Sequence, residues 1–119
     1  MRRSRELLER EITRFSVVEH DGMIVGCAAL YPYGEEQAEL ACLAVHAQYR
    51  RWGYGEQLMK RIEVRARAAG IKRLFVLTTV TSHWFKERGF VERPIDELPT
   101  EKRLMYNLQR RSKVLIKSL

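Results

Sequence analysis

Apolar residues along the chain fall into two kinds of pattern, short runs of strand length and longer stretches with helical spacing. The first two runs, Phe15–Glu19 and Met23–Tyr31, flank the pair Asp21-Gly22. Asp-Gly between two apolar runs favours a β-hairpin, because both residues tolerate the positive φ that a tight turn requires. Before the hairpin, Ser4–Arg14 places its leucines and isoleucine at helical spacing and predicts a short amphipathic helix.

A strand, a helix and a second strand are predicted in the middle of the chain. Ala38–Val45 is apolar except for Glu39, which is typical of a central strand covered on both faces. A loop leads to a helix that opens at Gly55, carries a basic face opposite an apolar stripe, and ends at Gly70. Leu74–Thr79 is a second buried run. This order favours parallel pairing of the two strands across the helix.

The last third of the chain predicts shorter elements. They are a helix at Ser82–Arg88 capped by Ser82, an extended piece at Phe90-Val91, a turn-rich connector at Pro94–Pro99, a helix at Thr100–Leu108 and a strand at Lys113–Leu119. Residues 1–119 show no repeat or linker, which indicates a single domain. The predicted fold class is α/β (α+β), with an antiparallel hairpin and a parallel unit in one mixed central sheet.

Composition indicates a folded protein outside the membrane. A chain of 119 residues suffices for one hydrophobic core, and 45% hydrophobic with 31% charged residues excludes a disordered or fibrous protein. No apolar stretch approaches the roughly 20 residues of a membrane span, and the first residues lack the apolar part of a signal peptide. We therefore expect a cytoplasmic protein with no membrane partner.

The cysteines and histidines do not suggest a metal site. Cys27 and Cys42 lie inside apolar runs without the spacing of metal ligands, and predict two reduced thiols in the core. His20, His46 and His83 have no triad or metal partner at useful spacing. We expect structural or surface histidines and no metal cofactor.

Basic residues give the first indication of a ligand. The net charge is +7, and residues 50–73 hold eight Lys and Arg against two carboxylates, Glu56 and Glu63. Such a concentration of positive charge favours a polyanion, which could be a nucleic acid, a membrane surface or a phosphorylated small molecule.

The charge begins at a glycine loop between the central strand and the basic helix. Gly53 and Gly55 expose backbone N–H groups next to a helix N-terminus, and Arg50 and Arg51 add full charges, a combination that suits a pyrophosphate. The third glycine of a dinucleotide-binding fingerprint would fall at Leu58, and the Gly-Lys-Ser/Thr of a P-loop is absent. Taken alone, the two glycines are also consistent with a simple tight turn.

Two segments carry recognisable motifs. They are Arg50-x-x-Gly53-x-Gly55 after the central strand and Trp84-Phe85-x-x-x-Gly89-Phe90. They resemble the acetyl-CoA signature R/Q-x-x-G-x-G/A and the Y-x-x-x-G-F segment of the GCN5-related N-acetyltransferases (GNAT). The resemblance implies a GNAT-like sheet with helices on both faces and acetyl-CoA as co-substrate. The implied cofactor contacts are Cys42, Leu43, Ala44, Val45, Arg50, Arg51, Trp52, Gly53, Tyr54, Gly55 and Glu56.

A narrower resemblance covers nearly the whole chain. The strings Arg2–Glu6, Cys27–Pro32, Glu39–His46, Leu74–Thr79, His83–Phe90 and Arg110–Leu115 resemble the acetyltransferase domain of bacterial N-acetylglutamate synthases. That family transfers the acetyl group of acetyl-CoA to the α-amino group of L-glutamate, in arginine biosynthesis. The comparison implies an N-terminally truncated domain without its first strand and first helix. It also implies a homo-oligomer or a separate kinase-like domain as partner.

The resemblance assigns roles to five further residues. Glu39, a lone carboxylate in an apolar strand, is the expected general base, with a solvent-facing strand-edge glutamate as the alternative. Thr78 is the expected second catalytic residue, with an ordinary strand threonine as the alternative. Arg2, Lys102 and Arg111 are the expected ligands of the glutamate carboxylates, each otherwise a solvated surface charge.

The sequence leaves other functions open. Many GNAT relatives carry a tyrosine at the position of Phe85 that protonates the departing thiolate. In this chain either a hydroxyl such as that of Thr78 replaces it, or the thiolate leaves without direct protonation. The acceptor could be another amino acid, a polyamine or a peptide amine. The chain could also be an incomplete, inactive module, or a small basic domain that binds nucleic acid or a protein. The last is disfavoured because the strands lack basic residues interleaved with aromatic ones, so we expect no nucleic-acid partner.

Overall fold

The computed structural model describes residues 14–79, 81–106 and 112–119. Its elements are β1 (Phe15–His20), β2 (Met23–Tyr33), β3 (Gln37–Val45), the 3₁₀ turn η1 (Ala47–Trp52), α2 (Tyr54–Ala68), β4 (Arg73–Thr78), α3 (Ser82–Lys86), β5 (Val91–Glu92), the 3₁₀ turn η2 (Ile95–Glu97), α4 (Thr100–Tyr106) and β6 (Lys113–Ser118). The helix expected at Ser4–Arg14 lies almost wholly outside the described residues.

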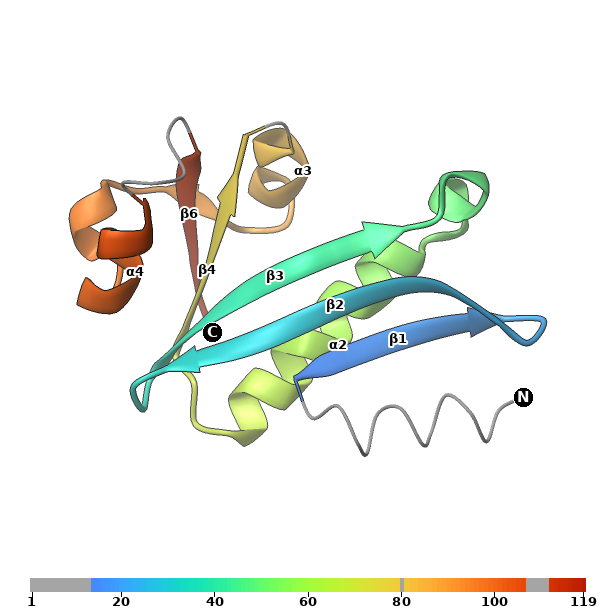
Figure 1. Ribbon diagram of the computed structural model, residues 1–119, viewed down its shortest axis with the longest axis horizontal. Helices are drawn as coiled ribbons and strands as arrows, with labels where there is room; N and C mark the ends of the chain where they lie inside the picture. The colour runs from blue at the N-terminus through green and yellow to red at the C-terminus, as the bar shows by residue number, and fades with distance from the viewer. Residues whose placement is uncertain (1–13, 80, 107–111) are drawn as a thin grey trace.

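The described strands form one mixed sheet in the order β1-β2-β3-β4-β6-β5 (Figure 1). β1 and β2 pair antiparallel around Asp21 and Gly22, whose φ angles of 49° and 84° are those that the Asp-Gly pair predicts. β3 pairs antiparallel with β2 and parallel with β4, and α2 connects β3 to β4. The predicted hairpin and the predicted strand-helix-strand unit are both confirmed.

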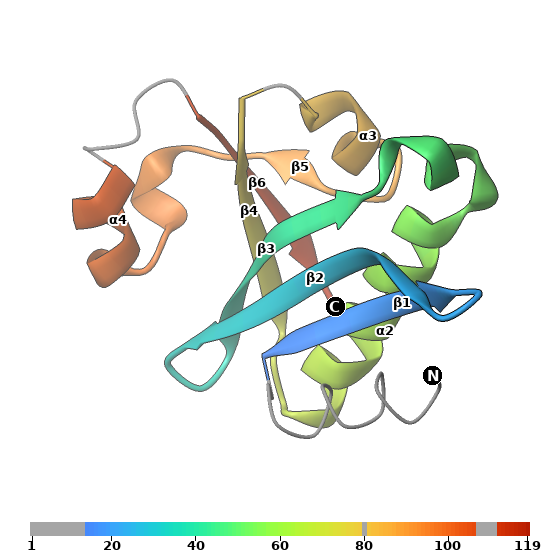
Figure 2. The same ribbon diagram turned by 45° about the vertical axis from the view of Figure 1, so that its right-hand side comes forward.

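Helical segments cover both faces of the sheet (Figures 1 and 2). On one face, Leu58 and Ile62 of α2 and Phe85 of α3 share a core with Leu74 and Val76 of β4. On the opposite face, Phe75 of β4 and Val114 and Ile116 of β6 pack with Ile95 of η2 and with Leu98, which follows η2. The expected helices on both faces are therefore confirmed. In the part of the chain that the structure describes, no helix combines the length and apolarity needed to cross a membrane.

Three local predictions around the glycine loop and α3 are wrong. The expected loop forms η1 instead, and α2 begins at Tyr54 with Gly53 as its N-cap, not at Gly55. Gly53 has a left-handed φ of 79°, so one residue ends η1 and starts α2. Thr81, not Ser82, is the N-cap residue of α3.

β3 is covered on both faces only along its first half. Ala38, Glu39 and Leu40 are buried, whereas Cys42 is exposed. The expected core thiol at Cys42 is therefore wrong, because the pairing with β4 ends at Glu39 and leaves the second half of β3 open. Cys27 on the neighbouring strand is half-buried, and burial raises the pKa of its thiol.

Glu97 of η2 connects the segment before α4 to β4 of the sheet through hydrogen bonds. Its carboxylate accepts hydrogen bonds from Arg93 Nε and from Arg73 Nη2, each at 2.8 Å. The bond from Arg93, the largest cause, holds the pKa of the Glu97 carboxyl below its ordinary value. A lowered folded pKa stabilises the fold above the unfolded value of about 4.3, and this contribution is lost as the pH falls through the folded pKa.

We expect Glu97→Gln to lower the melting temperature near neutral pH and to have no effect at a pH below the folded pKa of Glu97. The reason is that both proteins then carry a neutral side chain at this position. Thermal denaturation across the acidic range checks this, with Asp96→Asn, an exposed neighbour in η2, as control. A difference that is the same at every pH would contradict the assignment.

Candidate active site

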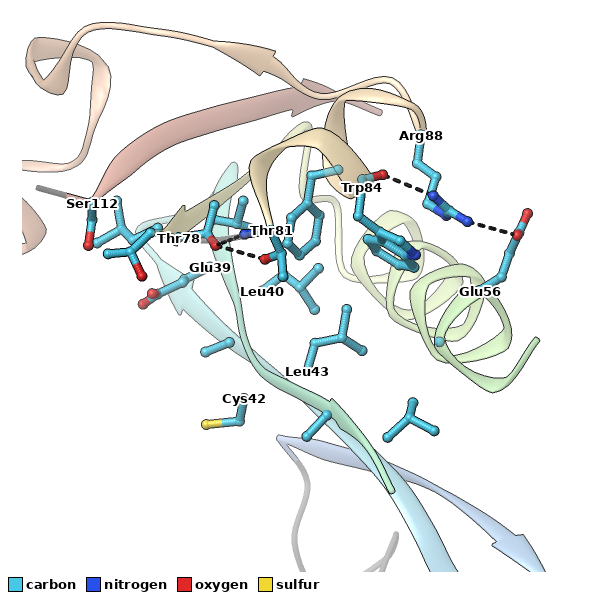
Figure 3. A pocket seen from close by; sticks show the side chains of 18 of the residues that line it. Glu39, Leu40, Cys42, Leu43, Glu56, Thr78, Thr81, Trp84, Arg88 and Ser112 are labelled. Carbon is cyan, nitrogen blue, oxygen red and sulfur yellow. Dashed lines mark hydrogen bonds and ion pairs between the residues drawn. The ribbon is translucent and has the colours of Figure 1, made fainter. Parts of the chain in front are cut away.

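A cavity opens where β3 and β4 diverge (Figure 3). Their parallel pairing ends at Glu39 and Phe75, and β3 then bulges around Cys42, whose φ of 55° is left-handed. The cavity has a volume of about 1150 Å³. It is lined by the second half of β3, the end of β4, α3, the start of α2 and Lys102 of α4.

The expected general base and one expected substrate ligand form a buried ion pair at one end of the cavity. Lys102 Nζ lies 3.0 Å from Glu39 Oε1, and the two side chains are 7% and 11% exposed. The alternative of a solvent-facing Glu39 is therefore wrong. A buried charged group is costly unless a partner compensates it, so the position of α4, which carries Lys102, and the buried position of Glu39 depend on each other.

Thr78, the second expected catalytic residue, lies across the divergence from Glu39. Alternation along β4 places its side chain on the face of Val76, whereas Glu39 is in register with Phe75 and shares the opposite face. Thr78 Oγ1 accepts a hydrogen bond from the Thr81 N–H at 3.1 Å and lies 2.7 Å from Thr81 Oγ1. The cavity is thus lined by the Glu39 carboxylate from one face of the sheet and by the Thr78 hydroxyl from the other, each held by a partner.

The start of α2 builds the other end of the cavity. Gly53 and Gly55 line it together with Arg50, whose Nε donates to the Val45 carbonyl at 3.3 Å. The first N–H groups of a helix have no partner within it, and Gly53 has no side chain that could cap them. A Cβ at Gly55 would lie 3.4 Å from the Trp84 ring, so this glycine allows α2 and α3 to approach closely. These donors suit an anion the size of a pyrophosphate.

All but three of the expected cofactor contacts line this cavity; Arg51, Trp52 and Tyr54 do not. Trp52 and Tyr54 instead pack against His20, with ring centroids 4.7 Å and 6.0 Å away. His20 Nδ1 also lies 2.6 Å from Tyr54 Oη. His20 therefore connects the β1–β2 turn to the glycine loop, and a cofactor contact by the three outlying residues stays a prediction.

Two expected site residues cannot be placed, and three residues that were not expected line the cavity. Arg2 and Arg111 lie outside the described residues, so their roles stay predictions. Trp84, Arg88 and Ser112 also line the cavity, and the sequence predicts a role in the site for none of them, although Trp84 belongs to the motif that ends at Gly89-Phe90. A signal existed for Trp84 and Arg88, since residues four apart share one face of the helix predicted at Ser82–Arg88, although α3 itself ends at Lys86. Ser112 offered no signal, because the pairing of β6 with the end of β4 brings it there.

Comparison with known sequences identifies the family. The sequence model of the Acetyltransferase (GNAT) family matches residues 1–93. The chain belongs to the GNAT family of acetyltransferases. Among its GNAT relatives, the amino-acid acetyltransferase of Pseudomonas syringae pv. tomato is 59% identical over 120 residues, which cover 100% of this chain and 28% of that protein.

Two solved structures of N-acetylglutamate synthase from Neisseria gonorrhoeae share the fold of this GNAT chain. The complex with coenzyme A and N-acetyl-glutamate matches with a TM-score of 0.88 and 47% identity, covering 97% of this chain and 28% of that one. The complex with coenzyme A and L-arginine matches with a TM-score of 0.85 and 48% identity, covering 100% and 28%. The chain thus spans little more than a quarter of the length of these relatives.

Proposed function

We propose that this protein transfers the acetyl group of acetyl-CoA to the α-amino group of L-glutamate, giving N-acetyl-L-glutamate. The cavity between β3 and β4 carries the proposal, because it has a carboxylate and a hydroxyl at one end and a helix N-terminus at the other. The relatives support the same reaction, since they are named amino-acid acetyltransferase and N-acetylglutamate synthase.

The described residues fit acetyl-CoA as the acetyl donor. The first-turn N–H groups of α2 and the Arg50 guanidinium suit its pyrophosphate. Beyond Glu39, β3 loses its pairing with β4, so backbone groups on this edge are available for the amides of the pantetheine arm, as they would be for an added strand. The thioester then lies at the bulge around Cys42 and Leu43, where backbone N–H groups suit a developing oxyanion.

The reaction requires a neutral amine beside the thioester. Glu39 takes a proton from the α-ammonium group of the acceptor, and the freed lone pair forms a C–N bond to the acetyl carbonyl carbon. The oxyanion is stabilised by N–H groups of the bulge, and its collapse breaks the C–S bond and releases the thiolate. Glu39 passes its first proton to water, and the nitrogen then loses its second proton to the regenerated carboxylate or directly to water. Thr78 is our candidate proton donor to the thiolate, because Phe85 has no proton to give.

The ammonium of Lys102 beside Glu39 favours an acceptor that carries a carboxylate. The Lys102 ammonium has three N–H donors, and one contact to Glu39 leaves others for a substrate carboxylate. Arg2 and Arg111 are proposed as the remaining ligands, since guanidinium groups bind carboxylates in bidentate fashion. If Arg2 and Arg111 join Lys102 as proposed, the three positive charges would repel a polyamine.

Acetyl transfer to a panel of amines tests the proposal. Release of the coenzyme A thiol would be measured with glutamate, glutamine, aspartate, lysine and spermidine as acceptors. We expect glutamate to have the highest kcat/KM. Faster turnover of lysine or spermidine would assign another acceptor. No turnover by folded protein that still binds coenzyme A would support an incomplete module.

We also propose a cytoplasmic role in arginine biosynthesis. The complex of the Neisseria relative with L-arginine supports this setting. A homo-oligomer or an amino-acid-kinase-like domain is the proposed partner, because the chain covers 28% of that relative. Sedimentation analysis of the isolated chain, with and without L-arginine, tests for self-association.

Gly53→Ala should weaken coenzyme A binding. The left-handed φ of 79° costs an alanine about 1–2 kcal/mol, and relaxing it would turn the first N–H groups of α2 away from the cavity. Gly34→Ala is the matched control, since Gly34 has φ 75° and, like Gly53, no described atom within 4 Å of an added Cβ. Chemical denaturation should give similar losses of stability for both variants, whereas calorimetric titration should show weaker binding for Gly53→Ala alone. Equal affinities for the two variants would contradict the role of the loop.

A further inference from the structure

Arg88, just after α3, presents its guanidinium to the start of α2 (Figure 3). Its guanidinium carbon lies 3.9 Å from the centroid of the Trp84 ring, and its Nη1 donates to the Trp84 carbonyl at 2.9 Å. Its Nη2 lies 3.4 Å from Glu56 Oε1 in the first turn of α2. Arg88, Trp84 and Glu56 all line the cavity, at the end that also holds Gly53 and Gly55.

The contacts of Arg88 differ in strength. The stacking on Trp84 and the bond to its carbonyl fix the plane of the guanidinium. The carboxylates of Glu56 and Glu87 are farther away, at 3.4 Å and 3.6 Å, and are 51% and 56% exposed. Charge-assisted hydrogen bonds between such groups are usually about 2.7–2.9 Å long. Nε is buried and has no hydrogen-bond partner among the described residues. The guanidinium is therefore well positioned but weakly paired.

Glu56 is an unusual residue for an anion-binding end of a cavity. A carboxylate in the first turn of a helix is stabilised by the helix dipole, so Glu56 occupies the position that the same dipole makes favourable for a bound anion. It is held there by Arg88 through a long contact, and its exposed side chain can rotate into solvent. A pyrophosphate at Gly53 and Gly55 would compete with Glu56 for Arg88.

We propose that Arg88 is a ligand of the acetyl-CoA pyrophosphate, and that Glu56 is an internal anion that the pyrophosphate displaces. The inference rests on the donor half of the proposed function and not on the identity of the acceptor. Arg88 then adds a donor from the end of α3 to those of the α2 N-terminus and of Arg50, all of which line the same cavity. Because Trp84 already orients the guanidinium, little conformational entropy is lost when the phosphate binds.

Two substitutions that break the same ion pair separate this role from a structural one. Arg88→Gln removes the ligand and should weaken coenzyme A binding by about 10-fold or more, as expected for a hydrogen bond between charged groups. Glu56→Gln removes the competing anion and should strengthen binding severalfold. If the ion pair served stability alone, both variants would change affinity in the same direction.

The measurement is calorimetric titration of each purified variant with coenzyme A, after thermal denaturation has confirmed that it is folded. Lys60→Gln removes one positive charge from the exposed face of α2 and should leave the affinity unchanged. Arg88→Lys should restore part of the affinity lost in Arg88→Gln. With dephospho-coenzyme A, which keeps the pyrophosphate but lacks the 3′-phosphate, the effect of Arg88→Gln should persist.

Three results would overturn the proposal. They are unchanged affinity in Arg88→Gln, weaker binding in Glu56→Gln, and loss of the Arg88 effect with dephospho-coenzyme A. Binding is measured without an acceptor, so failure of acetyl transfer to glutamate would overturn the proposed function while leaving this test intact. Conversely, normal turnover with normal coenzyme A affinity in Arg88→Gln would overturn the role of Arg88 alone.

Discussion

Glu39→Gln is expected to lower kcat by about 10²- to 10⁴-fold, the contribution typical of general acid–base catalysis. The amide has nearly the shape of the carboxylate and can still accept a hydrogen bond from Lys102, but it leaves the buried ammonium uncompensated, so we expect some loss of stability beside the loss of kcat. It cannot take the proton of the α-ammonium group at neutral pH. Steady-state kinetics should therefore show the loss in kcat, with the KM for acetyl-CoA nearly unchanged.

Glu63→Gln is the matched control for this prediction. Glu63 is also a buried carboxylate, 8% exposed, and Lys117 Nζ donates to it at 2.6 Å. It lies on α2 and does not line the cavity. We expect Glu63→Gln to reduce stability and to leave kcat close to that of the parent. Comparable loss of kcat in both variants would indicate that Glu39 acts through stability and not as the base.

Lys102→Met should destabilise the fold by about 3 kcal/mol, since removing one partner of a buried ion pair leaves the other charge uncompensated. In this variant the carboxylate of Glu39 would stay buried without its cation. The double variant Glu39→Gln/Lys102→Met should recover much of the loss, because the uncompensated charge is then absent. Urea denaturation of the parent, both single variants and the double variant measures the coupling between the two sites.

The same substitution should raise the KM for glutamate, because Lys102 is proposed to bind a substrate carboxylate. Lys117→Met supplies the comparison, since it breaks the part-buried pair with Glu63 outside the cavity. It should lower the free energy of unfolding without changing the KM for glutamate. If Lys102→Met lowers stability but leaves the KM for glutamate unchanged, Lys102 does not bind the substrate and only stabilises Glu39.

Local signals in the sequence predicted most of the fold correctly. Asp21-Gly22 gave a hairpin because turn formation depends on the φ values of two adjacent residues. The glycine loop was also predictable, since Gly53 and Gly55 act within one short segment between a strand and a helix. The helix start was misplaced at Gly55, because both glycines fit a loop and the left-handed φ of Gly53 was not evident from the residue type.

Interactions between distant segments were harder to predict. Cys42 looked like a core residue because its strand is apolar, and only the early divergence of β4 leaves its side chain exposed. Glu39 and Lys102 were expected in separate roles, and nothing in their local sequences shows that α4 brings them together. Arg88 and Glu56, 32 positions apart, were likewise not seen as neighbours.

The sequence by itself determined the order of the elements, the mixed sheet and the resemblance to GNAT acetyltransferases, because these depend on periodicity and on short motifs. The tertiary structure alone decided where β3 and β4 separate, that Lys102 pairs with Glu39, and that Arg88 contacts Glu56 at the start of α2. The reason is physical: a local pattern fixes which face of an element is apolar, whereas an ion pair or a cavity wall depends on how several elements pack together. The chemistry proposed here lies mainly at those contacts between elements.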